Sequence, residues 1–189
     1  DLHLSLRRQR QMCIRDRIRT IQPGEQHQFY EPHAFLGDRI IFSGNLMAEQ
    51  LPTGMDVYEY FLSNGSLRRF TESFDDWDEH AHYSPDESSV AWISSTGFDI
   101  VYEDYDRWAD DLITELWMMR ANGSQKTQLT HFNDPGYPEY TGGRTITADS
   151  SWSPEGDRLV VCITYEDSHG RLTNRELVLV EFDTEQSVE

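Results

Sequence analysis

Short apolar runs alternate with turn residues along the chain, and this spacing predicts β-strands rather than helices. The segments EPHAFLGDRIIFSG, HAHYSPDESSVAWISS and DSSWSPEGDRLVVCIT, which start at residues 31, 80 and 149, share one pattern. Each opens with a short polar strand, passes through a turn rich in Pro, Gly or Asp, and continues as a β-branched or aromatic run. The threefold recurrence of this pattern indicates a structural repeat.

A second pair of strands follows in the first two segments, as MDVYEYFLSNGSLRRFT and TELWMMRANGSQKTQLT. Asn-Gly between apolar runs is a strong hairpin signal because both residues tolerate positive φ. Repeated units of four short strands are typical of β-propellers. We therefore predict an all-β fold, a partial propeller of about three four-stranded blades at about 31–71, 80–130 and 149–189.

Two insertions widen the repeat. The segment FDIVYEDYDRWADDLI, inside the second blade, predicts a short helix near 104–112, and FNDPGYPEYTGGRTIT predicts a loop before the third blade. Inserted loops on a rigid β scaffold often carry function.

The motifs now allow a family comparison. Residues 152–159 and 83–90 follow W-S-P-(D/E)-G or a variant of it, and residues 56–71 and 115–130 follow (D/E)-(L/V)-(W/Y) with N-G-S and a final Thr. Over about 30–186 the chain resembles the repeat of TolB-type β-propellers. Glu87-Ser88 replaces the turn Gly in the second segment, and the first segment lacks Ser-Pro; neither departure changes the expected fold. The resemblance implies a periplasmic or extracellular protein with more blades, so we expect this chain to be a fragment.

Charge and composition limit the classes of partner that the protein can bind. The formal net charge is −18, which disfavours nucleic acid because phosphate binding needs basic patches. Plentiful aromatic residues argue against disorder, and no apolar run is long enough for a membrane span. The leader DLHLSLRRQRQMCIRDR resembles a translated sequencing adapter, so residues 1–17 are interpreted as non-native and 18–189 as the propeller; a native basic arm is the alternative.

The first strand of each segment is expected to line the central channel of such a propeller. Side chains alternate between the two faces of a strand. The face assigned to the channel is polar at all six positions: Glu31, His33, His80, His82, Asp149 and Ser151. Imidazoles and carboxylates on neighbouring strands could converge on a divalent cation, with His33, His80 and His82 as candidate ligands. The alternative is a polar lining for a water-filled channel.

Two further segments are candidates for binding. ESFDDWDEHAH is acidic but lacks the Gly of a calcium loop, which favours a solvated acidic loop. The inserted helix presents Tyr105 and Trp108, which either contact a partner or only pack against the blade.

No G-x-S-x-G elbow, P-loop, dinucleotide motif or zinc-binding Cys pair occurs, so no catalytic residue is assigned. We predict a non-catalytic scaffold that binds a protein or carbohydrate partner through the channel mouth and the inserted loops, without a certain cofactor. Two enzyme readings stay open. One is a metal-dependent polysaccharide lyase, since oligogalacturonate lyases resemble this repeat and hold a His-rich metal site. The other is the propeller of a serine peptidase without its hydrolase domain.

Overall fold

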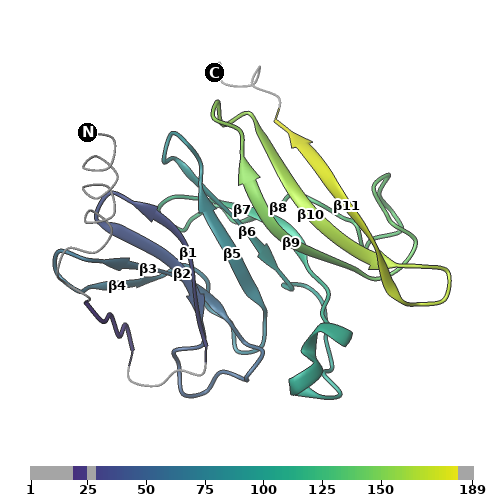
Figure 1. Ribbon diagram of the computed structural model, residues 1–189, viewed down its shortest axis with the longest axis horizontal. Coiled ribbons are helices and arrows are strands. Elements are labelled where there is room, and N and C mark those ends of the chain that lie inside the picture. Colours follow the sequence, from purple (N-terminus) through teal and green to yellow (C-terminus); the bar gives the residue numbers. More distant parts are fainter. Residues whose placement is uncertain (1–18, 25–28, 183–189) are drawn as a thin grey trace, which may run out of the picture.

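Three antiparallel sheets stand side by side, each connected as an up-and-down meander (Figure 1). The computed structural model describes residues 19–24 and 29–182, so the leader at 1–17 lies outside the described residues. The first sheet contains β1 (Tyr30–Leu36), β2 (Arg39–Gly44), β3 (Asp56–Phe61) and β4 (Leu67–Arg69). The second contains β5 (Asp78–Tyr83), β6 (Ser89–Ser94), β7 (Glu115–Arg120) and β8 (Thr127–Gln128). The third contains β9 (Thr145–Trp152), β10 (Arg158–Glu166) and β11 (Leu172–Glu181).

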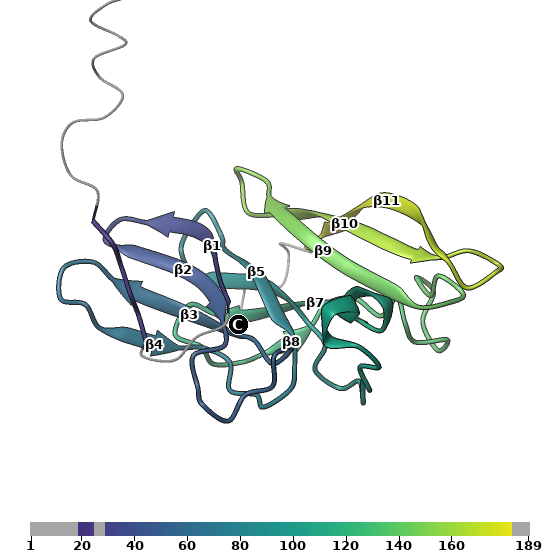
Figure 2. The same ribbon diagram turned by 60° about the horizontal axis from the view of Figure 1, so that its bottom comes forward.

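This arrangement confirms the predicted all-β partial propeller, with three strands of the third sheet among the described residues. The insertion in the second sheet forms the predicted short helix, a 3₁₀ turn η1 (Tyr105–Asp110). The inner strands β1, β5 and β9 lie next to one another, with β5 in contact with both others (Figures 1 and 2). No helix within the described residues is long and apolar enough to cross a membrane.

The Ser-Pro turns close in the same way in the second and third sheets. The carbonyl of Ser84 accepts from the Glu87 N–H at 2.9 Å, and that of Ser153 accepts from the Gly156 N–H at 3.0 Å. Gly156 has φ +75° and Glu87 has φ +62°. A non-glycine residue pays roughly 1–2 kcal/mol for this conformation. The second sheet therefore keeps the turn of the repeat without its glycine.

The Asn-Gly-Ser turns also form, but Asn acts differently from our expectation. Only the glycines take positive φ, +73° at Gly65 and +87° at Gly123. The side-chain oxygens of Asn64 and Asn122 instead accept from the backbone N–H two residues later, at 2.8 and 3.0 Å. The asparagines favour the turn by imitating its backbone hydrogen bond.

The acid and the final Thr of the second motif are hydrogen-bond partners. Thr71 Oγ1 donates to Asp56 at 3.2 Å, and Thr130 Oγ1 donates to Glu115 at 2.6 Å. In both sheets the N–H after the acid donates to the Thr hydroxyl at 2.9 Å. We call these two groups the carboxylate clasps; each joins the start of the third strand to the end of the fourth.

Apolar side chains fill the spaces between neighbouring sheets. Trp92 of β6 is 2% exposed and packs in the first interface, while Leu159 of β10 is fully buried in the second. Burying a side chain of this size stabilises the fold by about 1.5–3 kcal/mol. The first interface is formed by Ile41, Val57, Phe70, Ala81, Val90, Trp92 and Met119. The second is formed by Ala91, Leu116, Phe132, Leu159, Val161 and Ile163.

Two sequence expectations were wrong in detail. Strand β9 begins at Thr145, inside the segment predicted as a loop, because Thr145 and Thr147 are fully buried against the second sheet. The acidic segment 72–82 is only partly a solvated loop, since Asp78 and Glu79 belong to β5 and are 2% and 6% exposed.

Candidate functional site: a histidine and carboxylate cluster on the inner strands

Each inner strand carries one extra residue relative to its partner strand. The register shifts between Pro32 and Ala34 in β1, between Glu79 and His82 in β5, and opposite Val161–Ile163 in β9. His80 takes φ +52° at the bulge in β5. Bulges re-aim side chains and are common beside functional sites. In this chain they fall where the sequence concentrates histidines and carboxylates.

Glu31, His33 and His80 come together from two sheets. One candidate ligand atom from each lies within 4.8 Å of the other two, and all three side chains are half-buried. The ring centroids of His33 and His80 are 5.4 Å apart, and His82 lies 6.2 Å from His33. Nε2 of His33 is held by Ser43 Oγ at 2.8 Å. The structure thus brings together four of the six residues placed on this face, and Asp149 joins them through His82.

His82 and Asp149 connect the second sheet to the third. Nε2 of His82 lies 2.9 Å from Asp149 Oδ1, and the Asp149 side chain is 67% exposed. Burial acts to raise the pKa of Asp149, but the hydrogen bond with His82 and the charges of both histidines lower it overall. Ser151 is exposed and shares no hydrogen bond with these groups in the described part of the chain. Ser151 is therefore not placed with the other five.

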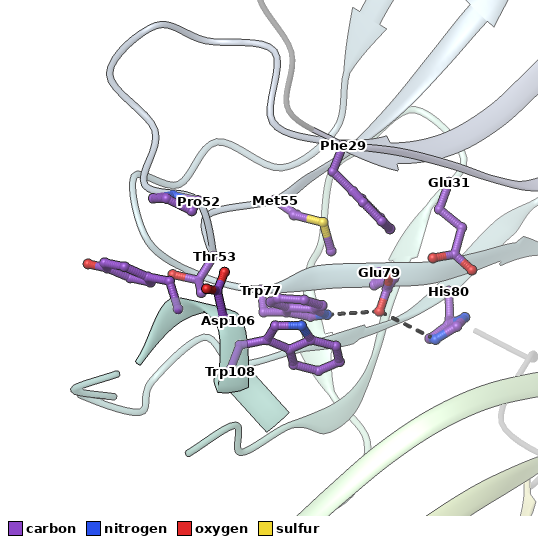
Figure 3. Close-up of a pocket in the computed structure, with 11 residues that line it drawn as sticks. Phe29, Glu31, Pro52, Thr53, Met55, Trp77, Glu79, His80, Asp106 and Trp108 are labelled. Carbon is purple, nitrogen blue, oxygen red and sulfur yellow. Dashed lines mark hydrogen bonds and ion pairs between the residues drawn. The ribbon is translucent and has the colours of Figure 1, made fainter. Parts of the chain in front are cut away.

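Glu79 belongs to the site although alternation did not point to it (Figure 3). Its Oε2 accepts from Trp77 Nε1 at 2.8 Å and lies 3.4 Å from His80 Nε2. Burial, and next the side chain of Glu31, raise the pKa of Glu79. The bulge at His80 breaks the two-residue period, so adjacent residues both reach the pocket. The sequence signal was the acidic residue directly before His-Ala-His. We call Glu31, His33, Glu79, His80, His82 and Asp149 the inner-strand cluster.

The imidazoles of the cluster are suited to accept a cation. Burial, and then the neighbouring His80 and His82, lower the pKa of His33 to about 3. Burial also lowers the pKa of His80, partly offset by Asp149 and Glu31. Among the described residues, no Lys or Arg forms an ion pair with the cluster carboxylates. Imidazoles of lowered pKa beside carboxylates that pair with histidines rather than with Lys or Arg are a donor set for a divalent cation.

A pocket of about 530 Å³ opens beside the cluster. Trp108 of η1 stacks on Trp77 with ring centroids 4.3 Å apart (Figure 3). Tyr105 lines the same pocket. Trp108 is 37% exposed and Tyr105 46% exposed. The two aromatic residues expected on the insertion thus lie beside the cluster. The full lining is Phe29, Glu31, Pro52, Thr53, Met55, Trp77, Glu79, His80, Tyr105, Asp106 and Trp108.

Comparison with known proteins identifies the fold. No family model matches the chain, and no curated protein matches it significantly. A puromycin-hydrolyzing peptidase of Mycobacterium tuberculosis is 15% identical over 82% of this chain, with a TM-score of 0.53. The tricorn protease is 20% identical over 71% of the chain (TM-score 0.43), and an oligogalacturonate lyase in complex with manganese is 12% identical over 73% (TM-score 0.42).

The chain spans only part of each of these proteins, 21% of the peptidase, 10% of the tricorn protease and 34% of the lyase. The likeness to the peptidase agrees with the three antiparallel sheets and is a likeness of fold. The chain has the architecture of a partial β-propeller.

Proposed function

We propose that the protein is a ligand-binding propeller module of the TolB type, acting outside the cytoplasm, whose inner-strand cluster holds a divalent cation. One observation carries the proposal. Glu31, His33 and His80 offer three ligand atoms within 4.8 Å of one another, from strands of two different sheets.

The donor chemistry favours a transition metal such as Mn²⁺ or Zn²⁺. Two nitrogen ligands and one carboxylate suit these ions better than Ca²⁺ or Mg²⁺, which prefer oxygen ligands throughout. Glu31, His33 and His80 would hold the ion. Glu79, fixed by the Trp77 indole, would orient His80 from behind, as carboxylates commonly do for metal-binding histidines.

The pocket supports a binding role. Its volume of about 530 Å³ falls in the range of small-molecule and side-chain sites. A protein or carbohydrate partner entering between β1 and η1 would reach the cluster directly. The cation would supply an electrophilic anchor, while the chain's own side chains would set the orientation of the ligand.

Calorimetric titration of chelator-treated protein with MnCl₂ and with ZnCl₂ tests the proposal. We expect one equivalent to bind, and His33→Ala and Glu31→Gln each to weaken binding about tenfold or more. A cation at 100 times its Kd should also stabilise the fold by about 2.7 kcal/mol.

His169→Ala is the matched control, because His169 lies in the exposed β10–β11 turn, away from the cluster. Its cation affinity should equal that of the parent protein. Absence of binding, or equal binding by all variants, would overturn the cation site. Cation-dependent cleavage of a uronate polymer would replace the non-catalytic role with the lyase reading.

A further inference from the structure

The pocket has an end that the cation proposal does not use. Beyond Glu31 and His80 it is walled by aromatic side chains from the start of β1, the approach to β5, and η1. Of these, Phe29 is 41% exposed, Tyr105 46% and Trp108 37%, so each offers ring surface to a ligand. We call Phe29, Trp77, Tyr105 and Trp108 the aromatic end.

Hydrogen bonds and ring stacking hold the tryptophans of the aromatic end in place. Trp77 is 6% exposed, its indole N–H is bound to Glu79, and its ring supports Trp108 from one side. Asp104 accepts from the Asp106 N–H at 3.0 Å and fixes the first turn of η1. A preformed aromatic surface costs little ordering when a ligand binds.

The charged side chains that line the pocket are acidic. Glu31, Glu79 and Asp106 line it, while no Lys or Arg is among the described lining residues. His80, the only basic group there, has a lowered pKa because it is buried. Asp106 forms no ion pair within the described residues, whereas Asp110 on the same turn pairs with Arg107.

An anionic ligand would meet these carboxylates unfavourably at the aromatic end. A neutral sugar ring would stack on Trp108 but would form no ion pair with Asp106. An organic cation satisfies both features, because aromatic faces attract ammonium and guanidinium groups and a carboxylate pairs with them. The apolar side chains of Pro52 and Met55 in the lining match the hydrocarbon stem of such a group.

We propose that the aromatic end binds the protonated side chain of a Lys or Arg in a basic peptide, over Trp108 and against Asp106. The inference rests on the proposed binding role and names the chemistry of its partner. The formal net charge of −18 would also steer a basic partner to the protein.

Titration by NMR, observing the indole N–H signals, tests the inference in chelator-treated protein. The probes are acetylated pentapeptides with Lys, Arg, norleucine or Glu at the centre of a glycine sequence. We expect the Lys and Arg peptides to bind about tenfold more tightly than the norleucine peptide, and the Glu peptide not to bind. Trp108→Ala and Asp106→Asn should each reduce the affinity about five- to tenfold.

Two matched variants control for general effects. Tyr140→Ala removes an aromatic residue of the same 37% exposure elsewhere, and Asp110→Asn removes an acid of η1 that does not line the pocket. Both should bind the Lys peptide as the parent does. Equal binding of the Lys and norleucine peptides would overturn the inference, as would a Trp108-dependent response to a neutral methyl glycoside instead.

The two proposals fail separately. His33→Ala should lose cation affinity and keep the Lys peptide, while Asp106→Asn should keep cation affinity and lose the peptide. If His33→Ala lost both, the peptide would be bound through the cluster, and the aromatic end would not be a site of its own.

Discussion

Glu115 and Glu79 are two buried glutamates of the same sheet, 0% and 6% exposed, with different surroundings. Glu115 accepts from Thr130 Oγ1 at 2.6 Å and from the backbone and side-chain N–H groups of Asn133 at 2.8 and 2.9 Å. Glu79 accepts from the Trp77 indole and, among the described residues, otherwise lies beside Glu31 and His80.

The difference between the two glutamates lies in how fully their carboxylate oxygens are hydrogen-bonded. Buried polar groups are normally satisfied, and each exception calls for an explanation. The carboxylate clasps are satisfied by donors from their own sheets and the adjoining loops, and the same clasp recurs at Asp56 and Glu115. The inner-strand cluster does not recur, and among the described residues its carboxylates pair with histidines and with no Lys or Arg. Completeness of hydrogen bonding, rather than burial, is therefore the feature by which we separate a carboxylate that holds the fold from a candidate ligand-binding carboxylate.

The same substitution at both glutamates should give the largest contrast. Glu115→Ala leaves the Thr130 hydroxyl and two Asn133 N–H groups without their acceptor, and we expect a loss of about 3 kcal/mol in the free energy of unfolding. Glu79→Ala removes one acceptor but also an acid that faces another acid, so the loss should stay below about 1 kcal/mol. Urea unfolding of both variants without added metal measures the contrast. Equal losses would contradict the distinction.

Backbone strain at His80 provides a second, smaller contrast. His80 has φ +52°, which costs an L-residue roughly 1–2 kcal/mol and costs glycine almost nothing. Without metal, His80→Gly should therefore be more stable than His80→Ala by about 1 kcal/mol, although both lose the imidazole.

At His82, which lacks positive φ, the order should reverse, with Ala more stable than Gly by about 0.5–1 kcal/mol. Thermal unfolding of the four variants measures both differences. If Ala were the more stable at both positions, the bulge would hold no strain, and the contrast between a strained His80 and a relaxed His82 would fail.

The fold could be predicted from the sequence because the repeated motifs form contacts between residues that are close along the chain. Ser-Pro turns, Asn-Gly-Ser turns and the acid-to-Thr clasp each act within one sheet, so they can be recognised without knowing how the sheets pack. Even Glu87, which departs from the motif, keeps the turn geometry of Gly156. The start of β9 was missed because tertiary burial of Thr145 and Thr147 overrode a loop-like composition.

The site was less accessible to sequence reasoning because it depends on irregular backbone. Alternation placed Glu31, His33 and His80 on one face, and the structure brings these three together. It left Glu79 out, since a bulge is an exception to the two-residue period. Stacking of Trp108 on Trp77 joins η1 to the approach to β5, a contact between distant segments that no local pattern reports.

The smallest expected effect is at Asp167, a carboxylate near the surface whose oxygens accept several hydrogen bonds. It accepts from the N–H groups of His169 and Arg171 at 2.8 and 3.1 Å and from the Arg171 guanidinium at 2.8 Å. These bonds, Arg171 first, lower the pKa of Asp167 to about 2. Because this lies below the value of about 3.9 in an unfolded chain, the stabilisation is present above pH 4 and is lost as the pH falls toward 2.

Thermal unfolding of Asp167→Asn should show a small loss of stability relative to the parent at pH 7 that vanishes near pH 2. Arg171→Gln should follow the same course. A deficit independent of pH would mean that the turn depends on side-chain shape, and that completeness of hydrogen bonding does not by itself identify a structural carboxylate.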